Sequence, residues 1–390
     1  MPSFAFTLAI FSLLIWLVLT FFWGGFWQLH GFLEGSGRPN PGLSLPSVAA
    51  VVPARDEAET IARCVKSLCA QNYAGEFRVI VVDDHSEDNT AALATEAAIQ
   101  AEAEQRVEVL RGESLPPGWT GKLWALQQGI AAADVAANSP DFFWFTDADI
   151  VHAPDTLALL VARAVREQRD LVSYMVMLHV KTVPERLLIP AFVYFFLMLY
   201  PPKWTARPNT KTAGAAGGCV LVRREALERL GGIAAIRQQV IDDCALAGAV
   251  KRVGGNVWLG LTRDSVSLRA YSSFAEIRDL IARTAFTQLH YSTWLLAGTL
   301  IGLVLTFLVP VALSFDTQGL VWRVSLTTWA LMTVTYLPTI RLYRLSPLWA
   351  PLLPLAAAFY CYATCLSAVR FWMGRGGQWK GRAQAPGGQS

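Results

Sequence analysis

Long apolar segments lie at both ends of the chain, and a more polar region of about residues 40–280 separates them. No charged residue occurs before Glu34, and residues 4–29 are almost entirely apolar or aromatic. Residues 294–313, 324–340 and 348–369 form three further apolar segments. Segments of this kind predict membrane-spanning helices. We therefore expect an N-terminal anchor within residues 1–30, and an amphipathic stretch followed by about three spans within residues 281–372.

A shorter apolar segment, residues 187–200, lies inside the central region and ends in Pro201-Pro202. If this segment crossed a membrane, Asp147 and Asp242 would face opposite compartments and could not share a site. We therefore expect a helix that lies at the membrane interface or packs in the core. The Gly- and Gln-rich residues 373–390 predict a flexible tail.

Apolar runs alternate with helical patterns through the central region. Residues 48–52, 78–82, 107–110 and 142–145 predict strands, and the second of these runs suits a strand that is buried on both faces. Helical patterns begin near Ile61, Thr90 and Thr120, and a threonine can cap the third helix. Strands that alternate with helices indicate right-handed βαβ units. The predicted fold class is α/β, with a mixed, mostly parallel sheet flanked by helices.

The overall composition is that of a membrane-associated protein. Hydrophobic residues make up 53% of the chain and charged residues 16%, an imbalance that would be unusual for a purely soluble enzyme. The formal net charge is only +3 and no basic run is present, so the sequence gives no support to nucleic-acid binding. The six cysteines form no C-x-x-C pair, so we expect neither a zinc site nor a disulfide framework.

Three acidic pairs are the candidate chemistry of the central region: Asp83-Asp84, Asp147 with Asp149, and Asp242-Asp243. The first two pairs follow predicted strands, at the edge of a parallel sheet where ligands bind. The carboxylates of Asp147 and Asp149 suit Mg²⁺ or Mn²⁺ that carries a substrate diphosphate. No dinucleotide or P-loop glycine motif occurs. An acidic turn at Asp147 and Asp149, and helix capping by the other two pairs, are the simpler alternatives.

An ordered set of motifs carries a resemblance to a known family. The set comprises V-V-P-A-R-D-E, V-V-D-D-H-S-x-D-N-T, T-D-A-D, G-G-C-V-L-V-R-R-E-A-L and I-D-D-C-A-L, all within about residues 48–290. It resembles the family 2 glycosyltransferases, which have a GT-A fold. Residues 117–125 and the terminal spans are similar to a narrower branch, the ceramide-glucosyltransferase-like enzymes and, closest, the hopene-associated glycosyltransferases of bacterial hopanoid pathways.

The resemblance implies a separate role for each group of candidate residues. Asp149, with Asp147, would hold the divalent cation on the diphosphate of a nucleotide-sugar donor. Asp243, with Asp242 beside it, would be the catalytic base of an inverting transfer to an acceptor hydroxyl. The remaining candidates would contact the nucleotide or its phosphates, and they are Pro53, Arg55, Glu57, Asp83, Asp84, Lys122 and Arg283. A solvated helix lysine is the alternative for Lys122.

Two departures from the family pattern refine these expectations. The family usually has Glu-Asp where this chain has Asp242-Asp243. Residues 281–284 replace the Q/R-x-x-R-W signature of many processive relatives, and their degeneration favours transfer of a single sugar. Arg283 remains as a candidate contact for the donor phosphates.

The expected location is the bacterial inner membrane, with the catalytic domain in the cytosol, where nucleotide sugars occur. Four spans would place Arg341 and Arg344 inside, but the basic residues after position 369 outside, which contradicts the positive-inside rule. Either the last segment is re-entrant or one span is miscounted. The expected acceptor is a membrane lipid, a hopanoid by the narrower resemblance. Polyprenyl phosphate, a polysaccharide, or a non-catalytic nucleotide-binding scaffold in the membrane are the alternatives.

Overall fold

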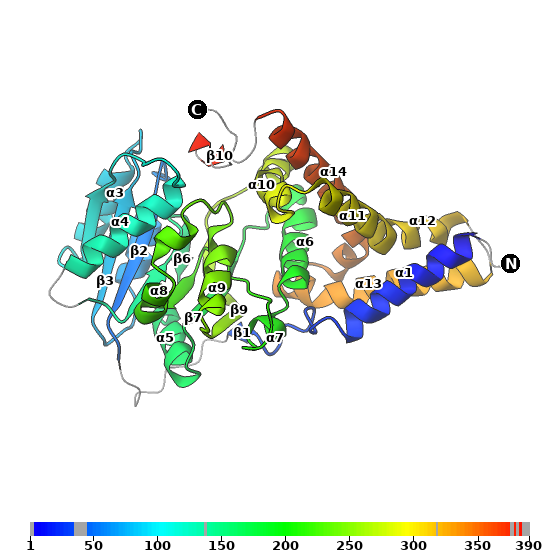
Figure 1. Ribbon diagram of the computed structural model, residues 1–390, viewed down its shortest axis with the longest axis horizontal. Coiled ribbons are helices and arrows are strands. Elements are labelled where there is room, and N and C mark those ends of the chain that lie inside the picture. The colour runs from blue at the N-terminus through cyan, green and yellow to red at the C-terminus, as the bar shows by residue number, and fades with distance from the viewer. Residues whose placement is uncertain are drawn as a thin grey trace.

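The chain forms a sheet-containing domain and a helical region that extends away from it (Figure 1). The structure is a computed structural model that describes residues 4–34, 45–135, 139–316 and 319–374, with two short strands at 378–379 and 382–383. Most of the predicted tail, residues 373–390, therefore lies outside the described residues.

Nine strands form one sheet, in the order β1-β9-β7-β8-β5-β2-β3-β4, with β6 paired to β9. Parallel pairs join β2 to β3 and β5, β3 to β4, and β9 to β1 and β7, whereas β8 runs antiparallel to both β5 and β7. The predicted fold class is therefore confirmed. The strands are β1 Leu33–Glu34, β2 Val48–Ala54, β3 Phe77–Asp83, β4 Val107–Arg111, β5 Phe142–Phe145, β6 Ile150–His152, β7 Leu171–Met177, β8 Val220–Arg223 and β9 Val257–Ser267.

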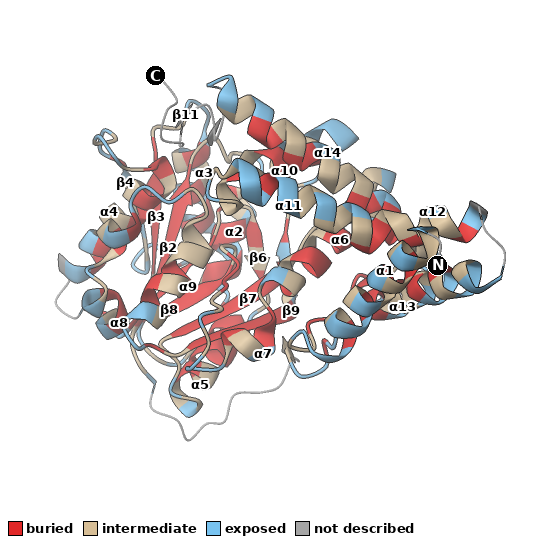
Figure 2. Cartoon of the chain, turned by 45° about the vertical axis from the view of Figure 1, so that its right-hand side comes forward, coloured by how far each residue is buried: buried red, intermediate tan, exposed pale blue. Residues whose placement is uncertain are grey.

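Alternate residues of the central strands face two hydrophobic cores. In β2, Val48, Ala50 and Val52 pack into the core on one face, and Ala49 and Val51 pack into the core on the other. The strands are consequently buried along most of their length (Figure 2). Apolar side chains on both faces explain why the sequence shows continuous β-branched runs rather than an alternating pattern.

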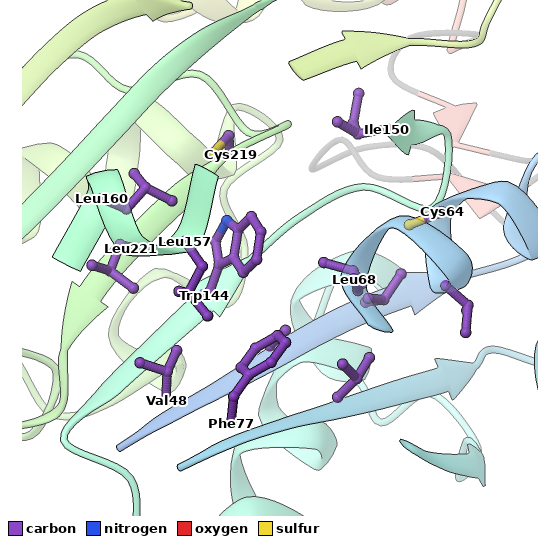
Figure 3. Packing of buried hydrophobic residues seen from close by; sticks show 14 of the residues in the cluster. Val48, Cys64, Leu68, Phe77, Trp144, Ile150, Leu157, Leu160, Cys219 and Leu221 are labelled. Atoms are coloured by element: carbon purple, nitrogen blue, oxygen red, sulfur yellow. The ribbon is translucent and has the colours of Figure 1, made fainter. Parts of the chain in front are cut away.

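Helices cover both faces of the sheet. One face packs against α2 Ile61–Cys69, α3 Thr90–Gln100 and α5 Thr156–Arg166. Figure 3 shows this core, in which Trp144 of β5 lies among Val48, Phe77, Leu157 and Leu160. The other face packs against α4 Gly121–Val135, α8 Arg224–Arg229 and α9 Asp242–Arg252.

The helical region contains a third hydrophobic core, distinct from the two cores of the sheet. The main helices of this region are α1 Phe4–Phe21, α6 Val183–Leu199, α10 Phe274–Gln288, α11 Thr293–Leu303, α12 Val309–Asp316, α13 Leu320–Leu342 and α14 Leu353–Trp372. A π-helical segment, Val304–Leu308, lies between α11 and α12, and the short α7 Pro202–Thr205 follows α6. Within the described residues, four helical segments are long and apolar enough to cross a membrane, namely Phe4–Phe21, Val183–Thr205, Thr293–Phe315 and Pro347–Trp372.

The helices differ from the apolar segments of the sequence in three places. α1 ends at Phe21, well before residue 29, and the chain turns just beyond it, where Gly24 and Gly25 adopt positive φ angles. α13 has the length of a span but is not among the four most apolar segments. The segment predicted at 187–200 is part of α6, whose inner face is buried in the third core.

Candidate active site

A cavity of about 260 Å³ opens at the carboxyl ends of β2 and β5. The turn between β5 and β6 supplies Asp147 and Asp149, and the first turn of α9 supplies Asp242 and Asp243. The two acidic pairs are nearly a hundred residues apart in the sequence, and the fold brings them to one cavity. The predicted site residues that line it are Pro53, Glu57, Lys122, Asp147, Asp149, Asp242, Asp243 and Arg283.

Lys122 connects the two acidic pairs. It is the second residue of α4, and its Nζ lies 2.7 Å from Oδ1 of Asp147 and 3.2 Å from Oδ2 of Asp242. Burial disfavours the charge of Lys122, but the carboxylates of Asp147 and Asp242 outweigh it and raise the lysine pKa. The pKa of Asp147 is lowered because the ammonium group of Lys122 outweighs the effect of its own burial. Lys122 is therefore an ion-paired residue of the cavity and not a solvated helix lysine.

Asp243 is held by two backbone amides. The N–H of Gly217 donates to Oδ2 of Asp243 at 2.8 Å, and the N–H of Cys244 donates to Oδ1 at 2.7 Å. Burial and the neighbouring carboxylate of Asp242 raise the pKa of Asp243 to about 6. A carboxyl group with this pKa and a fixed orientation can accept a proton near neutral pH.

Gly217 is a glycine because its neighbours leave little room for a side chain. A Cβ at this position would lie 3.1 Å from Nζ of Lys122 and 3.4 Å from Oδ2 of Asp243. Close approach of the backbone lets the Gly217 amide bond directly to the carboxylate.

Asp242 does not cap its helix, contrary to the simpler interpretation of the sequence. α9 begins at Asp242 itself, its N-cap position is Ile241, and no side chain caps this end. The carboxylate of Asp242 pairs with Lys122 instead. The two adjacent acids thus have different surroundings: Asp242 faces a cation, and Asp243 faces two amides.

Asp149 contacts residues that the sequence analysis missed. Ser267 Oγ donates to Oδ2 of Asp149 at 2.8 Å, and Nε of Arg269 lies 3.7 Å from the same oxygen. Arg269 also pairs with Glu57 at 2.8 Å. Burial and the nearby charge of Asp147 raise the pKa of Asp149. Ser267 and Arg269 lie at the end of β9, a strand that the sequence analysis did not predict, so their position at the cavity could not be recognised.

Three candidates do not line this cavity: Arg55, Asp83 and Asp84. Nη1 of Arg55 donates to the backbone carbonyl of Asp84 at 2.8 Å and lies 3.8 Å from its carboxylate, so these residues tie the end of β2 to the end of β3. Asp83 is buried, and its Oδ1 makes no hydrogen bond with any described residue.

The carboxylates of Asp147 and Asp149 fit a divalent cation that is completed by substrate. Within the described residues, no group of three or more His, Cys, Asp or Glu side chains could hold a metal by itself. Mg²⁺ is commonly bound by one or two carboxylates together with water and phosphate oxygens, and this pair offers only oxygen ligands. The protein alone therefore provides part of such a site, and a diphosphate could provide the rest.

A second cavity, of about 410 Å³, adjoins the first. The two share Lys122, Asp147, Asp242, Asp243 and Arg283 among their lining residues. The second cavity extends between α6, α10, α11 and α14 and is lined mostly by apolar side chains. It thus connects the acidic pairs with the helical region.

Comparison with known proteins shows what this domain is similar to. Residues 49–231 match the family model described as Glycosyl transferase family 2. This segment, just under half of the chain, is therefore similar to a glycosyltransferase family 2 domain. A mannosyltransferase from Pyrobaculum calidifontis, solved in complex with GDP-Man and Mn²⁺, has a similar fold, with a TM-score of 0.60 over 95% of this chain and 99% of that chain at 18% identity. The predicted GT-A fold is confirmed.

Curated relatives are similar over a shorter segment. An N-acetylglucosaminyltransferase of Bradyrhizobium elkanii is 32% identical over 126 residues, which is 31% of this chain and 62% of that protein. A beta-monoglucosyldiacylglycerol synthase of a Nostoc species is 32% identical over 126 residues, 32% of this chain and 25% of that protein. An N-acetylglucosaminyltransferase of Rhizobium leguminosarum bv. viciae is 32% identical over 117 residues, 30% of this chain and 25% of that protein. The match thus spans a quarter to about three fifths of these relatives.

Proposed function

We propose that the protein transfers one sugar from a nucleotide-diphospho-sugar to the hydroxyl group of a membrane lipid, with inversion at the anomeric carbon. The observation that carries this proposal is the oriented carboxylate of Asp243, in one cavity with Asp147 and Asp149. The match of residues 49–231 to the family 2 model supports the reaction class. The new glycosidic bond forms as the bond to the nucleotide diphosphate breaks, and the proton of the acceptor hydroxyl goes to Asp243.

The donor end of the cavity has groups suited to a diphosphate. Asp147 and Asp149 would hold Mg²⁺ or Mn²⁺, and a cation bound there would neutralise charge that develops on the leaving diphosphate. Lys122 and Arg283 are cations in the same cavity and can pair with phosphate oxygens. The Mn²⁺ and GDP-Man bound by the Pyrobaculum protein support this kind of donor complex.

Residues near the ends of β2 and β3 would bind the nucleotide. Pro53 and Glu57 line the cavity, and Arg55 with Asp84 fixes the loop beside it. Asp83, whose Oδ1 is buried without a hydrogen-bond partner among the described residues, would accept a hydrogen bond from the base or ribose only after its carboxylate turns toward the cavity.

The acceptor we propose is a membrane lipid, and a hopanoid is the specific candidate. The Nostoc relative is named as a synthase of a glucosylated diacylglycerol, which supports a lipid acceptor. The apolar helices and the adjoining cavity support it independently. The hopanoid itself rests on the sequence resemblance of residues 117–125 and the terminal helices. Transfer to polyprenyl phosphate or a polysaccharide is the second candidate.

The proposed location is the bacterial inner membrane, with the sheet domain in the cytosol and three spans. α1, the α11–α12 segment and α13 lie side by side and extend away from the sheet (Figure 1). α14 packs against α10 instead, and its Arg370 pairs with Asp279 of α10 at 2.7 Å. If α14 does not cross, Arg370 and the basic residues after it stay in the cytosol, as the positive-inside rule expects. The re-entrant alternative for the last segment is thus favoured.

The test is a donor-hydrolysis and transfer assay with the full chain in lipid nanodiscs. UDP- and GDP-sugars labelled in the sugar are supplied with Mg²⁺ or Mn²⁺, and release of nucleotide diphosphate and labelling of lipid are measured. We expect cation-dependent release that rises when membrane lipids are added. An absence of cleavage for every donor would contradict the glycosyltransferase proposal and favour a nucleotide-binding scaffold.

A further inference from the structure

We propose that the second cavity binds the apolar body of an uncharged lipid alcohol, whose hydroxyl group reaches Asp243 from the side of the membrane helices. This inference rests on the proposed transferase function and specifies the acceptor of that same site. It concerns the class of lipid and its route of entry, neither of which follows from the match to the family 2 model.

The walls of the second cavity suit an apolar ligand. Phe192, Phe196 and Leu199 of α6 lie on one side, and Ile281 and Ala285 of α10 contribute to the wall. Ligand cavities in proteins have volumes of roughly 300–1,000 Å³ and are mostly apolar, with a few polar groups that fix orientation. A cavity of about 410 Å³ with these walls is of that kind.

Apolar helices form the walls of the cavity on the side of the helical region. Thr299 of α11 and Thr364 of α14 complete the lining, and both helices belong to segments long and apolar enough to cross a membrane. α6 belongs to a third such segment. An occupant held between α11, which we propose as a span, and the re-entrant α14 would keep its apolar part away from water.

The charges at the inner end of the cavity favour a neutral head group. Asp147, Asp242 and Asp243 line it, against the cations Lys122 and Arg283. Lys122 is already paired with two of the carboxylates, whereas Arg283 forms no ion pair or hydrogen bond with another described residue. A lipid phosphate would thus meet three carboxylates, and the two cations beside them, Lys122 and Arg283, are the ones that we propose for the donor diphosphate. A hydroxyl group carries no such conflict.

A polar pair inside the apolar wall can orient the acceptor. Oη of Tyr200 accepts a hydrogen bond of 2.7 Å from Nε2 of Gln288, and both residues line the cavity. Hydroxyl oxygen accepts and donates hydrogen bonds, so this pair can also contact an acceptor oxygen beside Asp243.

The test blocks the cavity away from the catalytic residues. Thr299→Trp fills the cavity from α11, and Ile301→Trp is the matched control, because Ile301 is exposed on the same helix and does not line the cavity. Thr284→Phe blocks the cavity independently from α10. Each full-length variant is assayed in nanodiscs for cation-dependent donor hydrolysis. Sugar transfer is then measured to the neutral and the anionic lipid fractions of the source membranes, separated by ion exchange.

We expect the wild type to label the neutral fraction. Thr299→Trp and Thr284→Phe should lose at least tenfold in that transfer and retain donor hydrolysis within about twofold, which also shows that they fold. Ile301→Trp should match the wild type. Labelling of the anionic fraction alone, labelling of neither fraction despite donor hydrolysis, or full transfer by both blocking variants would overturn the inference. Absence of both activities in the wild type would instead contradict the proposed transferase function.

Discussion

The pH dependence of transfer provides a direct test of Asp243 as the base. The pKa of this carboxyl group is raised from an ordinary value of 3.8 to about 6, first by burial and next by the charge of Asp242. The base must be ionised to accept a proton, so the rate should rise with pH through the pKa. For a pKa of about 6, roughly 9% of the base is ionised at pH 5 and roughly 91% at pH 7, so kcat/KM should rise about tenfold between them.

A carboxyl group with an ordinary pKa would behave differently. With a pKa of 3.8, about 94% would already be ionised at pH 5, and the rate would be almost constant up to pH 7. The comparison of pH 5 with pH 7 therefore separates a perturbed base from an unperturbed one.

Two substitutions make the test specific to this pair. Asp243→Asn removes the base and should lower kcat by at least about a hundredfold, since general bases typically contribute 10²–10⁴. Asp242→Asn removes a charge that raises the pKa of Asp243, and it releases Lys122, whose charge lowers that pKa. Both effects act in the same direction. The midpoint of the Asp242→Asn profile should therefore lie below that of the wild type.

The assay measures initial rates of nucleotide diphosphate release in the presence of acceptor lipid, from pH 4.5 to 8, with donor binding measured by calorimetry for each variant. Donor affinity should change little in Asp243→Asn. The reasoning is refuted if Asp243→Asn keeps most of the wild-type rate, or if the Asp242→Asn midpoint does not move.

Three further predictions concern neighbouring residues. Lys122→Met should shift the midpoint of the same pH profile upward, because the ammonium group lowers the pKa of Asp243; an unchanged midpoint would contradict this electrostatic contact. Asp149→Asn should abolish cation-dependent transfer, measured as label in lipid across a Mn²⁺ titration, without loss of membrane-bound protein; near-normal turnover would mean that another residue holds the cation. Gly217→Ala should lower kcat by about tenfold, because its Cβ would crowd Lys122 and Asp243, and misplaced catalytic groups are costly; wild-type kinetics would show that the neighbours can shift without consequence.

The sequence predicted those parts of the fold that depend on local pattern. The runs around residues 80 and 144 are apolar on both faces because they lie between two cores, and that burial leaves a clear pattern in the sequence. The acidic residues that follow such strands were expected to meet at one edge of the sheet. Asp147 and Asp149 line the same cavity as Asp242 and Asp243, although their individual roles stay predictions.

Long-range contacts could not be predicted in the same way. Arg269 lies more than two hundred residues after Glu57 in the sequence, yet the two form an ion pair beside Asp149. α14 resembles a span by composition, and only its packing against α10 and α6 distinguishes it from α1. Phe195 of α6 is a further example, because its ring packs against Phe307 and Tyr360, contacts that the apolar pattern of residues 187–200 does not reveal.

The balance of charge in the first cavity connects these observations. Five acidic and three basic side chains line it: Glu57, Asp147, Asp149, Asp242, Asp243, Lys122, Arg269 and Arg283. Lys122 pairs with Asp147 and Asp242, and Arg269 pairs with Glu57. When all eight groups are ionised, the cavity therefore has an excess of two negative charges. This excess is consistent with the raised pKa of both carboxyl groups. A divalent cation would balance it, and a donor diphosphate could not approach without that balance, since like charges repel in a partly desolvated cavity. The arrangement therefore favours entry of the cation and the donor together, before the acceptor hydroxyl meets Asp243.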